Sequence, residues 1–240
     1  MYTEIPFADV AAASQRLYRD GRLVSGTMQR WRPYICPFER LLRWVRPESN
    51  VLDVGCGSGL FLGLCAELID GVRGIGFDAS EPTIRSARQM QSCLRQRVRD
   101  RLEFRRLDAR DPWPEGHFDV VALIDVMHHV PRDDQPALVA NAADKLAPGG
   151  MLIYKDISPR PLWRALANRL HDFIVAREAI HLRPMATVAA WLTDVGLKQV
   201  HCERANRLWY AHDIGLFARS PVTTIQSLHF DAPRVKGRNR

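Results

Sequence analysis

The sequence lacks the features typical of a disulfide-bonded secreted protein, a zinc-binding protein or a membrane-spanning protein. Its 240 residues hold five cysteines, and these form no Cys-x-x-Cys pair. An odd number at such spacing indicates neither a disulfide framework nor a zinc site. No stretch approaches the roughly 18 uninterrupted apolar residues of a membrane span, and the first residues lack a basic segment followed by an apolar one. We therefore expect a cytoplasmic chain whose thiols are reduced and mostly buried.

Lysine is also scarce, because arginine supplies all but four of the 34 basic residues. The net charge of +7 raises the question of an anionic partner such as nucleic acid. The excess is not gathered in one folded patch: residues 221–240 carry four basic side chains against Asp231, which accounts for +3 of the +7. We expect no nucleic-acid partner, and we predict a disordered basic tail over residues 220–240.

The chain does have a glycine-rich turn within residues 51–61. A short apolar run ends at Gly55, Gly57 and Gly59, and an amphipathic helix can begin at Leu60. A phosphate-binding P-loop would need Gly-Lys-Ser/Thr after the glycines, and a dinucleotide fingerprint would need Gly or Ala where Leu60 stands. The turn therefore predicts a nucleotide site of another kind.

The spacing Asp53-x-Gly55-x-Gly57-x-Gly59 resembles the first motif of the class I S-adenosylmethionine-dependent methyltransferases, small-molecule type. In that family the loop passes beneath a cationic sulfonium ligand, and here Asp53 can accept hydrogen bonds from the ligand's ammonium group or order the loop. The resemblance implies S-adenosyl-L-methionine as the cofactor. Its first contacts would be Asp53, Gly55, Cys56, Gly57 and Gly59.

Acidic residues follow the next three expected strands. Asp78 ends an apolar run over residues 72–78, where an acid can accept both ribose hydroxyls, as in nucleotide-binding βαβ units. After a strand over residues 102–107, the resemblance implies that Asp108 and Ala109 meet the adenine amino group and ring edge. The cofactor ligands predicted beyond the glycine loop are thus Asp78, Ala79, Asp108, Ala109 and Asp125.

Two adjacent histidines follow the expected fourth strand at residues 118–125. Many small-molecule methyltransferases of this class carry a paired histidine there, next to the transferred methyl group, so the resemblance makes His128 and His129 catalytic candidates. An imidazole with a pKa of about 6.5 is a competent general base at neutral pH. Two neighbouring histidines cannot both face the ligand, and the alternative is that they pack structurally. We expect no metal, because no fourth ligand accompanies Asp125 and the two histidines.

The Pro-Gly-Gly turn at residues 148–150, before a fifth strand over 151–156, also resembles this family. The resemblance implies an α/β, Rossmann-like fold. Its seven-stranded mixed sheet carries helices on both faces, and the last strand lies antiparallel between the fifth and sixth. We predict an N-terminal helical cap over residues 1–47, with helices over 7–20 and 37–45. The S-adenosylmethionine-binding domain then spans residues 48–219.

Residues 157–183 depart from a minimal domain and predict an inserted amphipathic helix after the fifth strand. In related enzymes this region and the N-terminus cover the substrate, so Trp163, His171 and Arg177 are candidates for acceptor recognition, with His171 also a catalytic candidate. Trp31 and Tyr34 can close over a ligand. Alternatively, these apolar residues pack on the core, or residues 159–177 contact a membrane surface.

We conclude from the sequence that the chain transfers a methyl group to an O, N or C atom of a small-molecule or carrier-bound acyl or aromatic acceptor. One alternative is an RNA or protein methyltransferase; the Asn-Pro-Pro-Tyr-like tetrad used for flipped bases is missing after residue 124. Another is a noncatalytic ligand-binding module with the same fold.

Overall fold

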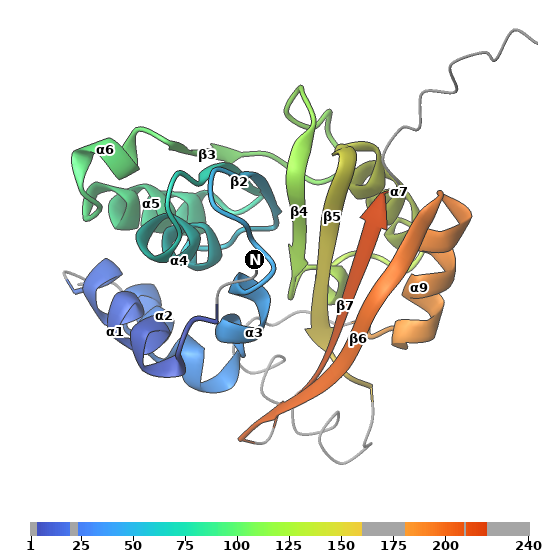
Figure 1. Ribbon diagram of the computed structural model, residues 1–240, viewed down its shortest axis with the longest axis horizontal. Helices are drawn as coiled ribbons and strands as arrows, with labels where there is room; N and C mark the ends of the chain where they lie inside the picture. Colours follow the sequence, from blue (N-terminus) through green and yellow to red (C-terminus); the bar gives the residue numbers. More distant parts are fainter. Residues whose placement is uncertain (1–3, 20–23, 160–180, 209, 220–240) are drawn as a thin grey trace, which may run out of the picture.

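The computed structural model describes residues 4–19, 24–159, 181–208 and 210–219. Its centre is a seven-stranded sheet in the order β3-β2-β1-β4-β5-β7-β6 (Figure 1). The last strand runs antiparallel to both of its neighbours, and the other pairs are parallel. The expected mixed sheet is confirmed. Its strands are β1 (Asn50–Val54), β2 (Arg73–Asp78), β3 (Leu102–Arg106), β4 (Phe118–Ile124), β5 (Leu146–Ile157), β6 (Leu197–Arg207) and β7 (Tyr210–Arg219).

Helices cover both faces of the sheet, and each face has its own apolar core. On one face α1, α3, α4 and α5 bury residues such as Leu42 and Leu62; on the other, α7 and α9 bury residues such as Leu138 and Val188. The helices are α1 (Phe7–Leu17), α2 (Val24–Ile35), α3 (Phe38–Leu42), α4 (Leu60–Leu68), α5 (Glu81–Ser92), α6 (Gln96–Arg99), the 3-10 turn η1 (Met127–His129), α7 (Gln135–Asp144) and α9 (Met185–Asp194).

Strand β1 shows why the central strands read as mainly apolar runs. Val51 points into the first core, whereas Leu52 and Val54 point into the second. Successive side chains of a strand alternate between faces, so a strand covered on both sides has no solvent-facing positions to fill with polar residues.

Helix α2 replaces the connection between the two expected N-terminal helices, and Pro33 lies inside it. A proline within a helix leaves the carbonyl four residues earlier without its N–H donor. That carbonyl belongs to Gln29, and it accepts a hydrogen bond from Ser14 Oγ of α1 at 2.8 Å. A tertiary contact with α1 thus satisfies the carbonyl. This contact cannot be predicted from the residues next to Pro33 in the sequence.

Several expected features fall outside the described residues. These are Trp163, His171 and Arg177 with most of the inserted segment 157–183, and the tail over 220–240. Among the helices that the structure does describe, none is both long and apolar enough to span a membrane.

Candidate active site

The glycine loop between β1 and α4 is shaped by three residues with positive φ. Gly55, Gly57 and Gly59 have φ values of 66°, 54° and 81°. A side chain on Gly55 would collide with Val126, and a Cβ on Gly59 would lie 2.8 Å from Phe104 Cε1. A Cβ on Gly57 would meet nothing within 4 Å. Packing therefore requires glycine at both ends of the loop, while its middle borders open space where a ligand can approach the backbone.

Asp53 lies beside this loop at the end of β1 and is almost completely buried. Its Oδ2 has no hydrogen-bond partner among the described residues. Burial, together with the nearby charge of Asp78, raises the pKa of the Asp53 carboxyl well above its ordinary value. A buried oxygen without a partner is costly, so a donor from a bound ligand, such as an ammonium group, would suit this position.

The carboxylate of Asp78 ties the glycine loop to the start of α5. Its Oδ2 accepts a hydrogen bond from the backbone N–H of Gly57 at 3.0 Å, and its Oδ1 accepts from the N–H of Ser80 at 2.9 Å. Thr83 Oγ1 donates to the same Oδ1 at 3.2 Å. The carboxylate is partly exposed at the carboxyl end of β2, beside the exposed Ala79, where it can still accept from a ligand.

Asp108 and Ala109 follow β3 and are already engaged by neighbouring side chains. Arg110 holds both oxygens of Asp108, with its Nη2 2.8 Å from Oδ2. These side-chain hydrogen bonds and the one from the Arg110 N–H lower the pKa of Asp108 to about 2. The carbonyl of Ala109 accepts a hydrogen bond from Trp113 Nε1 at 2.8 Å. An adenine amino group that donates a hydrogen bond to the Asp108 carboxylate would therefore share this acceptor with Arg110.

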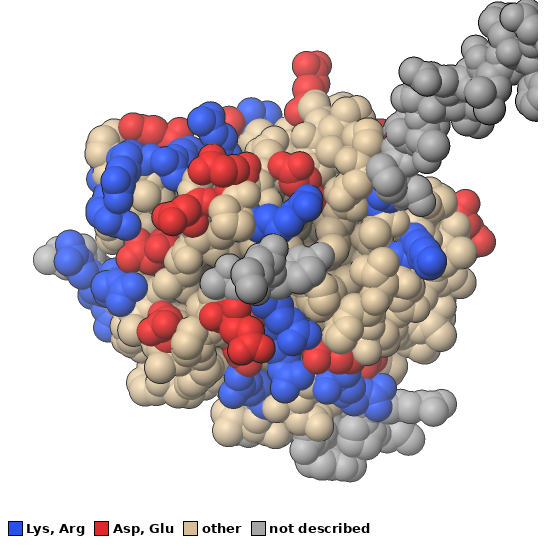
Figure 2. Space-filling view, viewed as in Figure 1, with Lys and Arg blue, Asp and Glu red and all other residues tan. Residues whose placement is uncertain are grey.

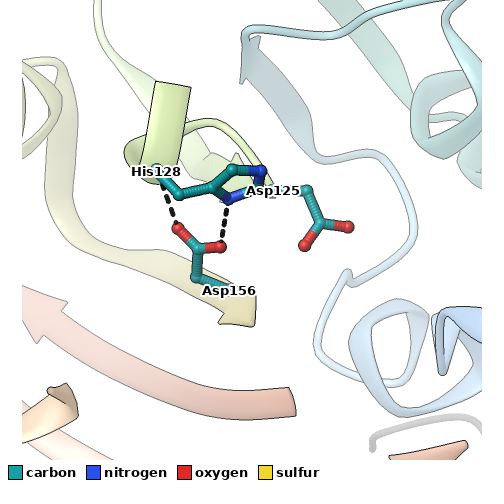
Figure 3. A group of neighbouring side chains, drawn as sticks. All are labelled: Asp125, His128 and Asp156. Carbon is teal, nitrogen blue, oxygen red and sulfur yellow. Dashed lines mark hydrogen bonds and ion pairs between the residues drawn. The ribbon is translucent and has the colours of Figure 1, made fainter. Parts of the chain in front are cut away.

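His128 and Asp156 form a buried pair where η1 faces the end of β5 (Figure 3). Asp156 Oδ1 lies 2.5 Å from His128 Nδ1, and Oδ2 accepts the His128 backbone N–H at 3.2 Å. The backbone N–H of Ile157 also donates to Oδ1, at 2.7 Å. Because the carboxylate holds Nδ1 as the protonated nitrogen, Nε2 becomes the ring atom suited to exchange a proton with a substrate.

His129 lies beside this pair but differs in environment. Its ring centroid is 4.1 Å from that of His128, and its side chain is exposed, whereas His128 is 3% exposed. The structure therefore separates the two adjacent histidines by burial and by the carboxylate that holds His128.

Asp125 follows β4 with a φ of 54° and meets two cations. Lys155 Nζ lies 2.6 Å from each carboxylate oxygen, and Arg32 Nη2 from α2 lies 2.9 Å from Oδ2. Burial alone would favour the neutral acid, but Lys155 and Arg32 hold the pKa of the Asp125 carboxyl well below its ordinary value.

The ligand atoms of Asp125, His128 and Asp156 lie within 4.8 Å of one another, a grouping compatible with a metal ion. The Lys155 ammonium and the Arg32 guanidinium already neutralise Asp125, so a divalent cation there would meet two positive charges. His128 Nδ1 is also engaged by Asp156. The arrangement is better suited to orienting an imidazole than to coordinating a metal.

Sequence reasoning missed five polar residues that build this region: Arg32, Gln135, Lys155, Asp156 and His212. One signal was available, because Lys155 and Asp156 interrupt the apolar run of β5 at its carboxyl end, where α/β folds bind ligands. His212, from β7, contacts the Ile35 carbonyl through Nε2 at 2.6 Å. Burial, followed by the Lys155 charge, lowers the pKa of His212 to about 3. Nothing local in the sequence marks it.

The fold and the glycine loop together define the architecture of a class I methyltransferase domain. Residues 28–202 match the model of a methyltransferase domain family. The chain belongs to this family, as the resemblance predicted, and the cofactor of this class is S-adenosylmethionine.

Individual relatives agree with this assignment. The ubiquinone biosynthesis O-methyltransferase of Pseudomonas paraeruginosa is 29% identical over 165 residues, covering 62% of this chain and 65% of the relative. The fatty-acid O-methyltransferase of Mycolicibacterium smegmatis is 35% identical over 125 residues, covering 50% and 43%. The chain thus spans less than two thirds of the length of these relatives. Magnesium protoporphyrin IX methyltransferase from Synechocystis, solved with bound SAH, has the same fold (TM-score 0.64, 21% identity, 87% of this chain and 93% of that chain covered).

Proposed function

We propose that the chain transfers a methyl group from S-adenosylmethionine to a hydroxyl oxygen of a small molecule, and that His128 is the general base. The observation that carries the proposal is the buried His128–Asp156 pair. Its turn packs directly on the cofactor loop, because the side chain of Val126 occupies the space beside Gly55. The pair therefore lies next to the loop beneath which the family binds its cofactor.

The residues present fit the cofactor. Gly57 offers open backbone, the unpartnered Oδ2 of Asp53 suits the ammonium group, and Asp78 suits the ribose hydroxyls. Asp108 and Ala109, at the carboxyl end of β3, suit the adenine. Bound S-adenosylmethionine supplies an electrophilic methyl group on its sulfonium. The chain must then align the acceptor and exclude water, because proximity and orientation carry most of such a reaction.

His128 takes the proton that the acceptor hydroxyl loses as its oxygen bonds to the methyl carbon. Nε2 accepts this proton while Nδ1–H remains hydrogen-bonded to Asp156, and the carboxylate stabilises the resulting imidazolium. Asp125 cannot compete for the proton, because Lys155 and Arg32 hold it ionised. Asp156 therefore stabilises the protonated His128, whereas Asp125 stays an anion paired with two cations.

The names of the relatives support an oxygen acceptor on a small molecule, since two of those described above are O-methyltransferases. A polyanionic partner has less support. In Figure 2 basic and acidic side chains are interspersed over the visible face. Residues 85–101 carry six arginines. Of these, Arg85 pairs with Glu81 at 3.6 Å, and Arg88 Nη2 donates to the Phe104 carbonyl at 3.0 Å.

The test replaces His128 and Asp156 separately by Asn, with His129→Asn as the matched control. A panel of phenols, catechols and long-chain fatty acids serves as acceptors for the wild-type chain. Loss of a general base lowers turnover by about 10²- to 10⁴-fold, so we expect this loss at His128, a smaller loss at Asp156, and wild-type turnover at His129. Calorimetric affinity for adenosylhomocysteine should be unchanged in all three. Wild-type turnover in His128→Asn would overturn the base assignment, and a wild-type chain that does not bind adenosylhomocysteine would overturn the proposed function.

A further inference from the structure

We infer that Gln135 is a positioning residue, which holds the turn carrying His128 so that its imidazole stays in register with Asp156. The inference rests on the proposed function, because it assigns Gln135 a role through the proposed base. Gln135 is the first residue of α7 and is fully buried, at 0% exposure. It lies among backbone groups of the turn and of the chain that returns after residue 180.

The side-chain amide of Gln135 satisfies carbonyls on both sides of His128. Its Nε2 lies 3.1 Å from the carbonyl oxygen of Met127 and 3.1 Å from that of Val130. These two residues bracket His128 and His129. One side chain therefore holds the 3-10 turn at both ends, which fixes the backbone from which the imidazole projects.

The same amide joins the turn to residues 181–183. Nε2 lies 3.0 Å from the His181 carbonyl oxygen, and Arg183 Nε donates to Gln135 Oε1 at 2.7 Å. Because a guanidinium can only donate, the Arg183 contact identifies which end of the amide is oxygen. The backbone N–H of His181 in turn donates to the carbonyl of His128 itself, at 2.8 Å.

This network matters because the His128–Asp156 pair joins two different elements of the fold. Asp156 is fixed within β5, where it pairs in register with Asp213 of β7, whereas His128 belongs to a three-residue 3-10 turn. Such short turns have poorer hydrogen-bond geometry than longer helices. Without Gln135, the carbonyls of Met127, Val130 and His181 would lose the two N–H donors that they share, and the two ends of the turn would no longer be joined by one side chain. A displacement of about 1 Å can cost a reaction about 10²-fold.

The experiment compares Gln135→Met with Gln91→Met. Gln91 is the matched control, because its Nε2 also bridges two backbone carbonyls, those of Arg99 and Leu102, at 2.9 and 2.6 Å. Gln91 connects α5 to the end of α6 and the start of β3 and has no part in the proposed machinery. Two quantities are measured in full-length protein: turnover with the wild-type chain's best acceptor from the panel, and the downfield proton resonance of His128 Nδ1–H. The resonance is assigned by its loss in Asp156→Asn and needs no substrate.

We expect Gln135→Met to lower turnover by about 10²-fold, to leave the affinity for adenosylhomocysteine unchanged, and to broaden or abolish the Nδ1–H resonance. Gln91→Met should lower the melting temperature but keep both the turnover and the resonance. A Gln135→Met resonance like that of wild type would overturn the inference, as would equal losses of turnover in the two variants. If the resonance is lost in Gln135→Met but the wild-type chain does not bind adenosylhomocysteine, the positioning role stands and the proposed function fails.

Discussion

At the scale of single residues, acids of the same kind take different chemical states because their neighbours differ. Asp53 is buried with an unpartnered oxygen, and its pKa is raised. Asp125 is largely shielded from solvent, but the cations of Lys155 and Arg32 lower its pKa. Burial raises the pKa of a carboxyl group because it favours the neutral acid, whereas a nearby positive charge lowers the pKa. One acid is thus suited to meet a cationic ligand group and the other is held as a fixed anion.

His212 gives a prediction about pH. Its pKa falls from 6.5 to about 3, first through burial and then through the charge of Lys155; Asp125 opposes this shift and Arg32 adds to it. Above pH 6.5 the residue is neutral in the folded and the unfolded chain. Between about pH 6.5 and pH 3 the unfolded chain binds a proton that the folded chain does not bind. Stability must therefore fall as the pH falls through this window.

The variant His212→Gln, whose amide can still donate to the Ile35 carbonyl, removes this effect. From pH 6 to pH 5, wild type should lose about 1 kcal/mol more unfolding free energy than the variant, since each pH unit in the window is worth at most about 1.4 kcal/mol. Urea unfolding at pH 7, 6 and 5 measures the difference, in which the other titrating groups cancel. Parallel pH profiles for the two proteins would contradict the lowered pKa.

How far single residues can be predicted from the sequence depends on whether their signal is local. Asp53, the three glycines and Asp78 form a spaced pattern, and the structure places them around one loop. It was not predictable that His128, and not His129, is held by a carboxylate, because that carboxylate belongs to Asp156, 28 positions later. Spacing reveals neighbours along the chain, whereas the partner of a side chain is set by strand pairing.

At the scale of elements, the strands were easier to predict than the N-terminal helices. A strand buried on both faces reads as an apolar run that turn residues end, so β1 and β4 appear in the sequence near their observed bounds. Helix α2 was not predicted, because proline is unfavourable inside a helix. The Gln29 carbonyl, which Pro33 leaves without a backbone donor, accepts a hydrogen bond from Ser14 of α1 instead. Strand β6 carries little apolar signal, because its residues are largely exposed.

The junction between β4 and β5 gives a prediction on stability. In Lys155→Met, Asp125 keeps just one of its two cationic partners, and breaking a buried pair from one side costs about 3 to 5 kcal/mol. In Arg32→Gln, Asp125 keeps the fully buried Lys155. Because the Arg32 side chain is 35% exposed, its loss should cost about 1 kcal/mol or less. Urea unfolding without cofactor measures both.

A double variant separates the charge from packing. Adding Asp125→Asn to Lys155→Met removes the uncompensated anion, so stability should recover by about half or more, because replacing both members of a buried pair is often close to neutral. Equal stability of Lys155→Met and Arg32→Gln would contradict the larger contribution expected from Lys155. A double variant no more stable than Lys155→Met alone would indicate lost packing instead of an unpaired charge.

At the scale of the whole molecule, the N-terminal helices share a core with the sheet. Val10 of α1 and Leu42 of α3 are fully buried in the same cluster as Val51 of β1 and Leu64 of α4. Tyr18 adds a hydrogen bond, because its hydroxyl donates to the Ser58 carbonyl of the glycine loop at 2.6 Å. The cap therefore supports the cofactor loop directly. The division at residues 47 and 48 drawn from the sequence stays a prediction, which truncation can test.

We predict that a chain shortened to residues 48–240 does not fold cooperatively. Burying one leucine or valine contributes about 1.5 to 3 kcal/mol, and α1 and α3 together bury Val10, Leu17, Leu41 and Leu42 at 3% exposure or less. Their summed contribution is comparable to the total stability of a domain, about 5 to 15 kcal/mol. The shortened chain should be largely insoluble, and its soluble fraction should show no sharp thermal transition by circular dichroism. Leu42→Ala in the full chain, expected to lower stability by about 2 to 5 kcal/mol while keeping a single transition, shows the graded form of the same effect. If the shortened chain instead melts in one transition close to that of the full chain, residues 48–219 fold on their own and the cap is an addition to a complete core.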